Sequence, residues 1–152
     1  MNKNVETPIG ETVIEQLIAH VRNSYSQSLN GYFQLCRRYA QIKKSSFESN
    51  QKQFFFKTDS LFYDPEGKIN WDNVRQLLPP NMEQHIKGKY RMLKYNEIRL
   101  CCLLAFDISP ETIASIKLYK KASIPSIKHL IKQKSGIQDF TGLLREITLN
   151  QL

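Results

Sequence analysis

Two short helical segments between residues 109 and 137 constrain the fold of this chain more than any other feature. The first opens with Ser109 and Pro110, residue types that favour the cap and the first position of a helix. The second ends on lysines and Gly136, as helix C-termini commonly do. Between Glu111 and Asp139 the chain has no carboxylate, but six lysines and one histidine. The pattern predicts two packed helices, the second with a basic surface.

The rest of the chain also has helical patterns, with no alternating strand pattern of convincing length. From Thr12 to about Lys44, apolar residues recur at spacings of three and four: Ile14, Ile18, Val21, Tyr25, Leu29, Tyr32, Cys36 and Tyr39. This predicts one long helix, or two helices with a break near residues 24–28. Near-heptad spacing favours a coiled-coil dimerisation segment, whereas the wide stripe and Gly31 favour packing inside a helical domain. We predict an all-α fold: a long N-terminal helix or helical hairpin, then a C-terminal helix-turn-helix bundle.

Shorter helices are expected between and after these regions. Residues 64–67 form a turn signal, and Asn70 or Asp72 could start a short helix that the prolines at 79–80 end. Asn81 could cap the next helix. Three consecutive phenylalanines at 54–56 predict either a helix buried on most sides or an exposed docking patch. A last helix would pack against the motif through one apolar face: Phe140, Leu143, Leu144 and Ile147.

Composition excludes several classes of protein. No apolar run is long enough to span a membrane, and the N-terminus lacks the apolar stretch of a signal peptide. Three cysteines do not make a disulfide framework and are interpreted as buried free thiols in a reducing cytoplasm. The net charge is +8, of which residues 76–152 carry +6 because they hold twelve Lys and Arg against six Asp and Glu. Such a basic half suits a polyanion, or is merely a solvated surface.

Catalytic chemistry leaves little trace in the sequence. The three histidines are far apart, and none has a second ligand at metal-binding spacing on a helix face. Cys101 and Cys102 are adjacent and point about 100° apart on a helix, which disfavours shared zinc ligation. Neither a Gly-rich phosphate loop nor a nucleophile elbow is present. We therefore expect neither an enzyme nor a metal or other cofactor.

One family shares this arrangement of residues. The residues concerned are Trp71, the run Asn96–Leu104 (NEIRLCCLL), Ser109, Ile113-Ala114, Ile124, Ile131 and Gly136-Ile137. Over about residues 60–150 the chain resembles the C-terminal helix-turn-helix of LuxR-type response regulators. It is more similar still to a diverged form at the C-terminus of Bacteroidetes regulators with tetratricopeptide repeats and a coiled coil. The resemblance implies a winged-less LuxR-like helix-turn-helix domain at 63–152, with preceding Trp-containing helices. The helical pattern before it predicts an N-terminal helical region at 1–62, a candidate for coiled-coil dimerisation. The resemblance also implies that such a segment often ends a longer repeat protein.

Several positions depart from the family's pattern. The family has a hydroxyl cap, a glycine, an apolar residue and a second hydroxyl cap where this chain has Lys94, Asp107, Lys117 and Lys120. Pro125 falls about five residues into the second, recognition helix, where proline would remove a backbone hydrogen bond. We therefore expect the helix to begin later, with Ser123 as its cap and Pro125 in its first turn. That would shorten the end that usually contacts base edges.

The candidate site is the basic face of the two motif helices. Lys120 and Lys121 lie in the connection, where they could contact phosphates. The recognition helix would add hydroxyls at its start and basic side chains along it: Ser123, Ser126, Lys128, His129, Lys132 and, at its end, Lys134. On helical spacing Lys128 and Lys132 share a face, whereas Ile124, Ile127 and Ile131 turn toward the core. With no arginine on this helix, contacts to phosphate rather than to bases would dominate.

Two functions follow from this interpretation. The first is a DNA-binding transcriptional regulator in the cytoplasm, with DNA as partner and its N-terminal helices forming a homodimer or relaying a signal. The second is a non-enzymatic interaction module whose degenerate helix-turn-helix has lost DNA and kept the fold. The basic window favours the first function. The departures at Lys117, Lys120 and Pro125 favour the second.

Overall fold

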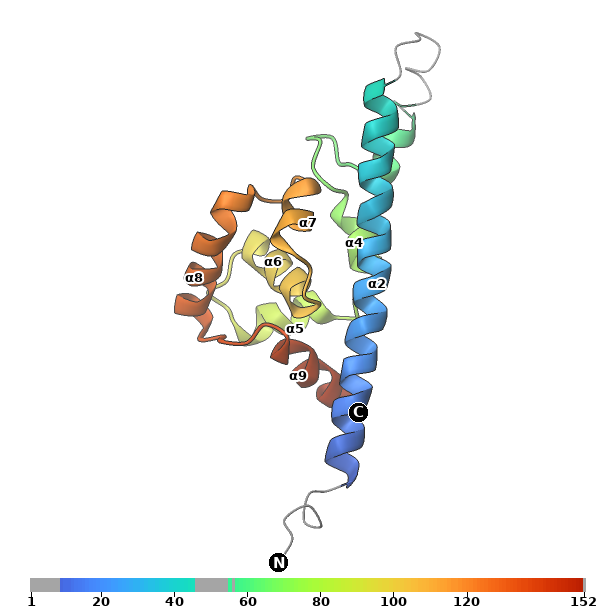
Figure 1. Ribbon diagram of the computed structural model, residues 1–152. Coiled ribbons are helices and arrows are strands. Elements are labelled where there is room, and N and C mark those ends of the chain that lie inside the picture. Colours follow the sequence, from blue (N-terminus) through green and yellow to red (C-terminus); the bar gives the residue numbers. More distant parts are fainter. Residues whose placement is uncertain (1–8, 46–54, 56, 152) are drawn as a thin grey trace, which may run out of the picture.

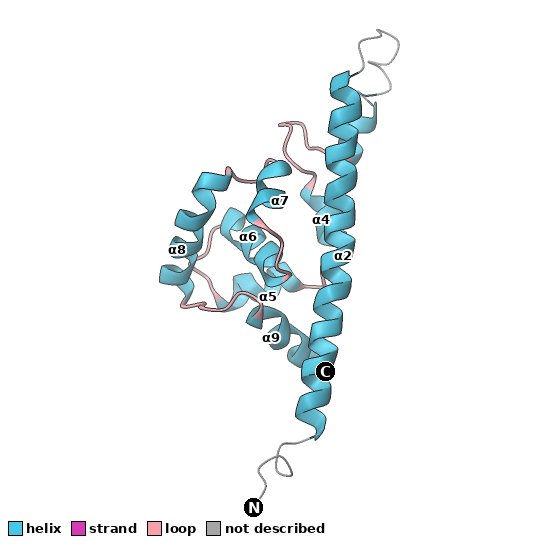
Figure 2. Cartoon of the chain, viewed as in Figure 1, coloured by secondary structure: helices cyan, strands magenta, loops and turns pink. Residues whose placement is uncertain are grey.

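The computed structural model describes residues 9–45, 55 and 57–151 of the 152-residue chain. The regular secondary structure of these residues is helical, and within them there is no strand, only one isolated bridge between Tyr63 and Ile69. Figure 2 shows the helices joined by short loops. The all-α prediction is thus confirmed.

Residues Ile9–Ser45 form α2, a single continuous helix. The long-helix alternative is therefore correct, and no break occurs near residues 24–28. After it follow η1 (Asp59–Leu61), α4 (Trp71–Gln76), α5 (Met82–Lys89), α6 (Tyr95–Ala105), α7 (Pro110–Ser115), η2 (Lys121–Ser123), α8 (Ile124–Ser135) and α9 (Gly142–Gln151). In Figure 1, α2 runs along one edge of the molecule, α4 to α9 gather on one side of it, and α8 lies farthest from it.

The apolar stripe of α2 packs into the body of the protein. Its fully buried side chains join one hydrophobic core with residues of α4, α5, α6, α8 and α9: Ile18, Leu29, Phe33 and Cys36. The sequence left two alternatives for this stripe, a coiled-coil seam or packing inside a helical domain, and the second is correct. A coiled-coil dimer through the same stripe would have to expose that core.

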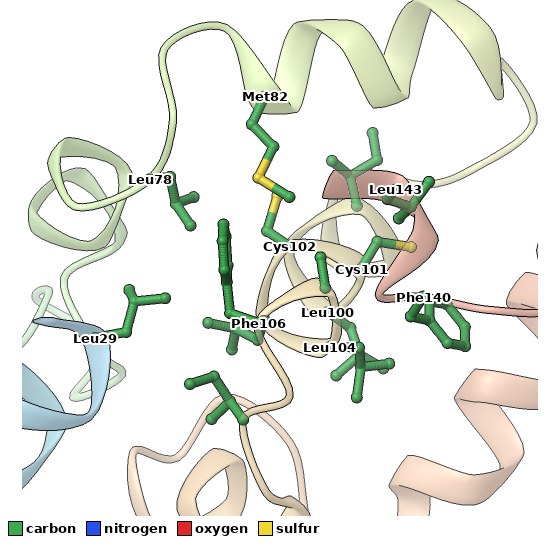
Figure 3. Packing of buried hydrophobic residues seen from close by; sticks show 14 of the residues in the cluster. Leu29, Leu78, Met82, Leu100, Cys101, Cys102, Leu104, Phe106, Phe140 and Leu143 are labelled. Carbon is green, nitrogen blue, oxygen red and sulfur yellow. The ribbon is translucent and has the colours of Figure 1, made fainter. Parts of the chain in front are cut away.

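Helix α6 lies at the centre of the core. Leu100, Cys101, Cys102 and Leu103 are fully buried, because neighbouring helices cover α6 on several sides. Phe106, just after the helix, is also fully buried, and its ring centroid lies 5.3 Å from that of Tyr25 in α2. Figure 3 shows Phe106 close to Leu29 of α2, to Leu78 and to Met82 of α5. Phe106 thus ties the N-terminal helix to the bundle.

Local signals in the sequence fix most helix ends. Asn70 caps α4 by accepting a hydrogen bond from the backbone N–H of Asp72, at 3.2 Å. Asn81 precedes α5 with a left-handed backbone and makes no side-chain cap.

The expected last helix packs through Phe140, Leu143, Leu144 and Ile147, all buried. Of the three phenylalanines at 54–56, Phe55 is buried, and the other two lie outside the described residues.

Two of the departures from the family's pattern coincide with left-handed backbone. Asp107 has φ 59° and Lys117 has φ 61°. Left-handed backbone costs a residue with a Cβ roughly 1–2 kcal/mol, less for Asp than for Lys. Lys117 directly follows the last turn of α7, where glycine is the usual residue. The apolar side chain expected at this position is not needed, since Lys117 is exposed.

The Lys117→Gly substitution is expected to raise the free energy of unfolding by about 0.5–1 kcal/mol. Relief of the left-handed strain outweighs the greater entropy of glycine in the unfolded chain. Urea denaturation would measure the change. The same substitution at Lys120, whose φ of −69° is ordinary, should instead lower stability. Equal losses at both positions would contradict a role for backbone strain at Lys117.

Candidate nucleic-acid interface

The two motif helices form as their caps predict. Ser109 Oγ accepts the backbone N–H of Thr112 at 3.1 Å, and Pro110 occupies the first position of α7. Helix α8 ends at Gly136, whose φ is 78° and whose N–H donates to the Lys132 carbonyl. The start of α7 and the end of α8 therefore carry residues suited to these backbone geometries.

Helix α8 begins late, as Pro125 requires. Its N-cap is Ser123 and Pro125 lies in the first turn, where the proline removes no helical hydrogen bond. Residues Lys121–Ser123 form the separate 3-10 turn η2, with Lys120 as its N-cap. Ser123 makes no side-chain cap hydrogen bond. The predicted later start is confirmed, whereas Ser123 occupies the cap position without providing the bond.

The hydroxyl cap missing from α6 is replaced by a carboxylate. Lys94 is the N-cap residue, and its backbone N–H donates to Glu97 Oε1 at 2.7 Å. A capping box has two hydrogen bonds, and this one, from the cap residue's backbone N–H to the carboxylate three residues later, needs no hydroxyl on the cap residue. The departure at Lys94 therefore leaves the start of α6 intact.

Buried isoleucines set the orientation of α8. Ile124 and Ile131 are buried against the core, and Ile127 is half-buried and packs on it. Ser126 and His129 lie on the opposite, exposed face together with two residues that sequence reasoning missed, Leu130 and Gln133. Counting 100° per residue from Ile131 would have found Gln133. The outward face of α8 therefore carries polar side chains and one exposed leucine, rather than a row of lysines.

The two central lysines of α8 lie beside this outward face. Lys128 Nζ and Lys132 Nζ stand 5.9 and 6.0 Å from the ring centroid of Phe140. Both side chains are half-buried. The alkyl stems thus cover the edge of the core while the ammonium groups flank the outward face. The prediction that they share a face is confirmed.

Lys134 is not part of this surface. Its Nζ lies 2.9 and 3.0 Å from the two carboxylate oxygens of Glu97 in α6, and the Glu97 side chain is only 6% exposed. This ion pair holds the C-terminal end of α8 against the start of α6. The prediction that Lys134 contacts DNA is therefore corrected, because its ammonium group balances the buried carboxylate of Glu97 instead.

The connection between the helices carries a second carboxylate contact. Lys121 Nζ lies 3.0 Å from Glu111 Oε1 at the start of α7, with both side chains well exposed. The hydrogen bond from Lys121 lowers the pKa of Glu111. Exposed pairs of this kind contribute little, so a phosphate could replace Glu111 as the partner of Lys121. Lys120 is exposed. The structure thus brings Lys120, Lys121, Ser126 and His129 to the surface.

Comparison with known proteins adds no further information: no family model, curated protein or solved structure matches this chain. The described residues contain no helix long and apolar enough to cross a membrane. Nor do they contain a group of three or more potential metal ligands. Function must therefore be inferred from the residues of α7, η2 and α8 themselves.

Proposed function

We propose that the chain is a DNA-binding transcriptional regulator of the cytoplasm, which contacts DNA through α8 and η2 in the manner of a diverged LuxR-type helix-turn-helix. We assign it no catalytic role. The observation that carries the proposal is the surface of α8, where Ser126, His129 and Gln133 face outward and Lys128 and Lys132 stand beside them. Polar side chains that enter a DNA groove can contact base edges, and cations at the edge of the groove can contact phosphates.

The charges around α8 support phosphate contacts. Two carboxylates close to the motif are engaged, Glu97 with Lys134 and Glu111 with Lys121. Among the ion pairs of the described residues, none includes Lys120, Lys128 or Lys132. These three cations are thus available to neutralise phosphates. Binding dominated by them would weaken steeply with salt.

Charge reversal at Lys128→Glu/Lys132→Glu is expected to weaken binding to a mixed-sequence duplex by at least about tenfold. For every phosphate that the protein no longer neutralises, the salt slope of the binding constant should also fall by about 0.9. Fluorescence anisotropy at low and near-physiological salt would measure both quantities. A matched control, Lys44→Glu/Lys57→Glu, changes the net charge equally at exposed residues outside α7 and α8. Absence of wild-type binding at low salt would refute the proposal.

One observation favours the alternative function, a protein-interaction module that no longer binds DNA. Leu130 is 41% exposed on the outward face of α8, where it would meet a polar groove if DNA were bound. An apolar side chain there suits a protein partner better. The Leu130→Gln variant distinguishes the two functions, because it should leave DNA affinity almost unchanged while weakening an interface with a protein.

A further inference from the structure

A second apolar stripe runs along α2 outside the face that packs on the bundle, roughly 100° round the helix from the buried stripe. Four aliphatic side chains about half exposed lie along it: Val13 (47%), Leu17 (52%), Leu35 (58%) and Ile42 (52%). At 100° per residue, Leu17 and Leu35 point in the same direction, and the other two deviate by no more than about 40°. They therefore form one straight line of apolar groups along the helix, distinct from the buried stripe.

Between its two apolar ends, the stripe consists of small residues. Ser24, Ser28 and Gly31 are exposed and lie on the same line. Gly31 has an ordinary helical backbone, and a Cβ added there would meet nothing within 4 Å. Glycine in a helix interior is less stable than alanine, and none of the described residues lies close enough to Gly31 to explain it. Small residues in this position allow another helix to approach closely.

The same face carries no charge over much of its length. The exposed residues between positions 16 and 35 include no Lys, Arg, Asp or Glu: Gln16, Leu17, Ala19, His20, Asn23, Ser24, Gln27, Ser28, Gly31, Gln34 and Leu35. In the whole chain, 24% of residues are charged. A solvated helix face normally carries charges, whereas the cores of protein interfaces are depleted of them. Because this face carries no charge over these residues, the same face of a second copy can approach it without repulsion.

We propose that two copies of this chain associate through this face, with their α2 helices antiparallel. The midpoint of Leu17 and Leu35 is residue 26, and that of Val13 and Ile42 falls between residues 27 and 28. A twofold axis near these positions would pair Leu17 with Leu35 of the other copy and place the small residues at the crossing. Parallel packing would instead bring Arg38 close to its own copy.

The size of the face fits a dimer of modest affinity. From Val13 to Ile42 the stripe covers 29 residue-to-residue steps, or about 44 Å at the rise of an α-helix. With a helix about 10 Å wide, this gives about 450 Å² on each copy, or about 900 Å² in all. The flanking glutamines would bring the total near the roughly 1,000 Å² that a specific interface needs. Self-association of this kind is independent of DNA binding, and either can hold without the other.

Light scattering after gel filtration, over a range of micromolar concentrations, tests self-association. The wild type is expected to shift from monomer to dimer as concentration rises. Leu17→Glu/Leu35→Glu should raise the dissociation constant by roughly 100-fold, since each change buries an unpaired charge at the interface. A matched control, Leu61→Glu/Met92→Glu, alters two exposed apolar residues outside α2, at 60% and 72% exposure, and should leave the dimer intact. A wild type monomeric throughout, or a dimer unaffected by the α2 variant, overturns the proposal.

Cysteine cross-linking tests the orientation. In the antiparallel pair, Ser28→Cys lies within about one helical turn of its own copy and should form a disulfide dimer on mild oxidation. Leu17→Cys would lie about 30 Å from its copy along the helix and should not. The three native thiols are buried, and burial raises the pKa of Cys36 to about 11 and that of Cys101 to about 12, so background reaction should be slow. Efficient cross-linking through Leu17→Cys would show parallel helices and overturn the proposal.

Discussion

Glu97→Ala is expected to lower the free energy of unfolding by about 3–5 kcal/mol, because it leaves the Lys134 ammonium buried without a counter-charge. The Lys134 side chain is only 20% exposed. The substitution also removes the acceptor of the Lys94 backbone N–H at the start of α6. A domain of this size is commonly stable by only about 5–15 kcal/mol, so the variant should lie near the limit of folding. Denaturant unfolding followed by circular dichroism would measure the decrease.

A second variant separates the effect of the buried charge from that of the missing hydrogen bonds. Glu97→Met/Lys134→Met removes both charges and should recover all but about 1 kcal/mol, the part due to the absent cap. Glu111→Gln breaks the exposed pair with Lys121 and should leave stability unchanged. If the double variant is no more stable than Glu97→Ala, the buried charge is not the cause.

Phe106→Ala is expected to cost about 3–5 kcal/mol of unfolding free energy. The ring is fully buried where α6 ends, and it packs against Tyr25 of α2. Removing it leaves a cavity between the long helix and the bundle, which the rigid α2 cannot easily close. The decrease of near-ultraviolet circular dichroism, together with the denaturation midpoint, would show whether α2 stays packed.

The matched control for this prediction is Leu61→Ala. Leu61 is 60% exposed, so its truncation should change stability by less than about 0.5 kcal/mol. A decrease below about 1 kcal/mol for Phe106→Ala would mean that α2 contributes little to the core, although its buried side chains belong to the same cluster as Phe106.

Much of the fold could be predicted because its signals are local. The cap at Ser109, the late start imposed by Pro125 and the end at Gly136 each depend on backbone geometry within a few residues. The inward turn of Ile124 and Ile131 follows from helical spacing. The sequence did not show that α2 continues through residues 24–28. Several residues there have only average helix propensity, and the packing of the neighbouring turns keeps them helical.

The candidate site was predicted less completely. Spacing grouped Lys128 with Lys132 correctly, but it did not show that both lie at the edge of the core and that Gln133 faces outward. Lys134 illustrates the main difficulty: its partner Glu97 stands 37 residues earlier in the chain. A window without carboxylates in sequence is therefore not one without carboxylates in space.

By itself, the sequence determined the helical class, the ends of the motif helices and the basic character of the C-terminal half, since these depend on residue types and short-range periodicity. Only the tertiary structure decided which surfaces remain exposed. It buries the near-heptad stripe of α2 against the bundle, and leaves the line from Val13 to Ile42 in solvent. Both stripes have helical periodicity. Which of them is covered depends on where distant helices pack, and helical spacing cannot encode that.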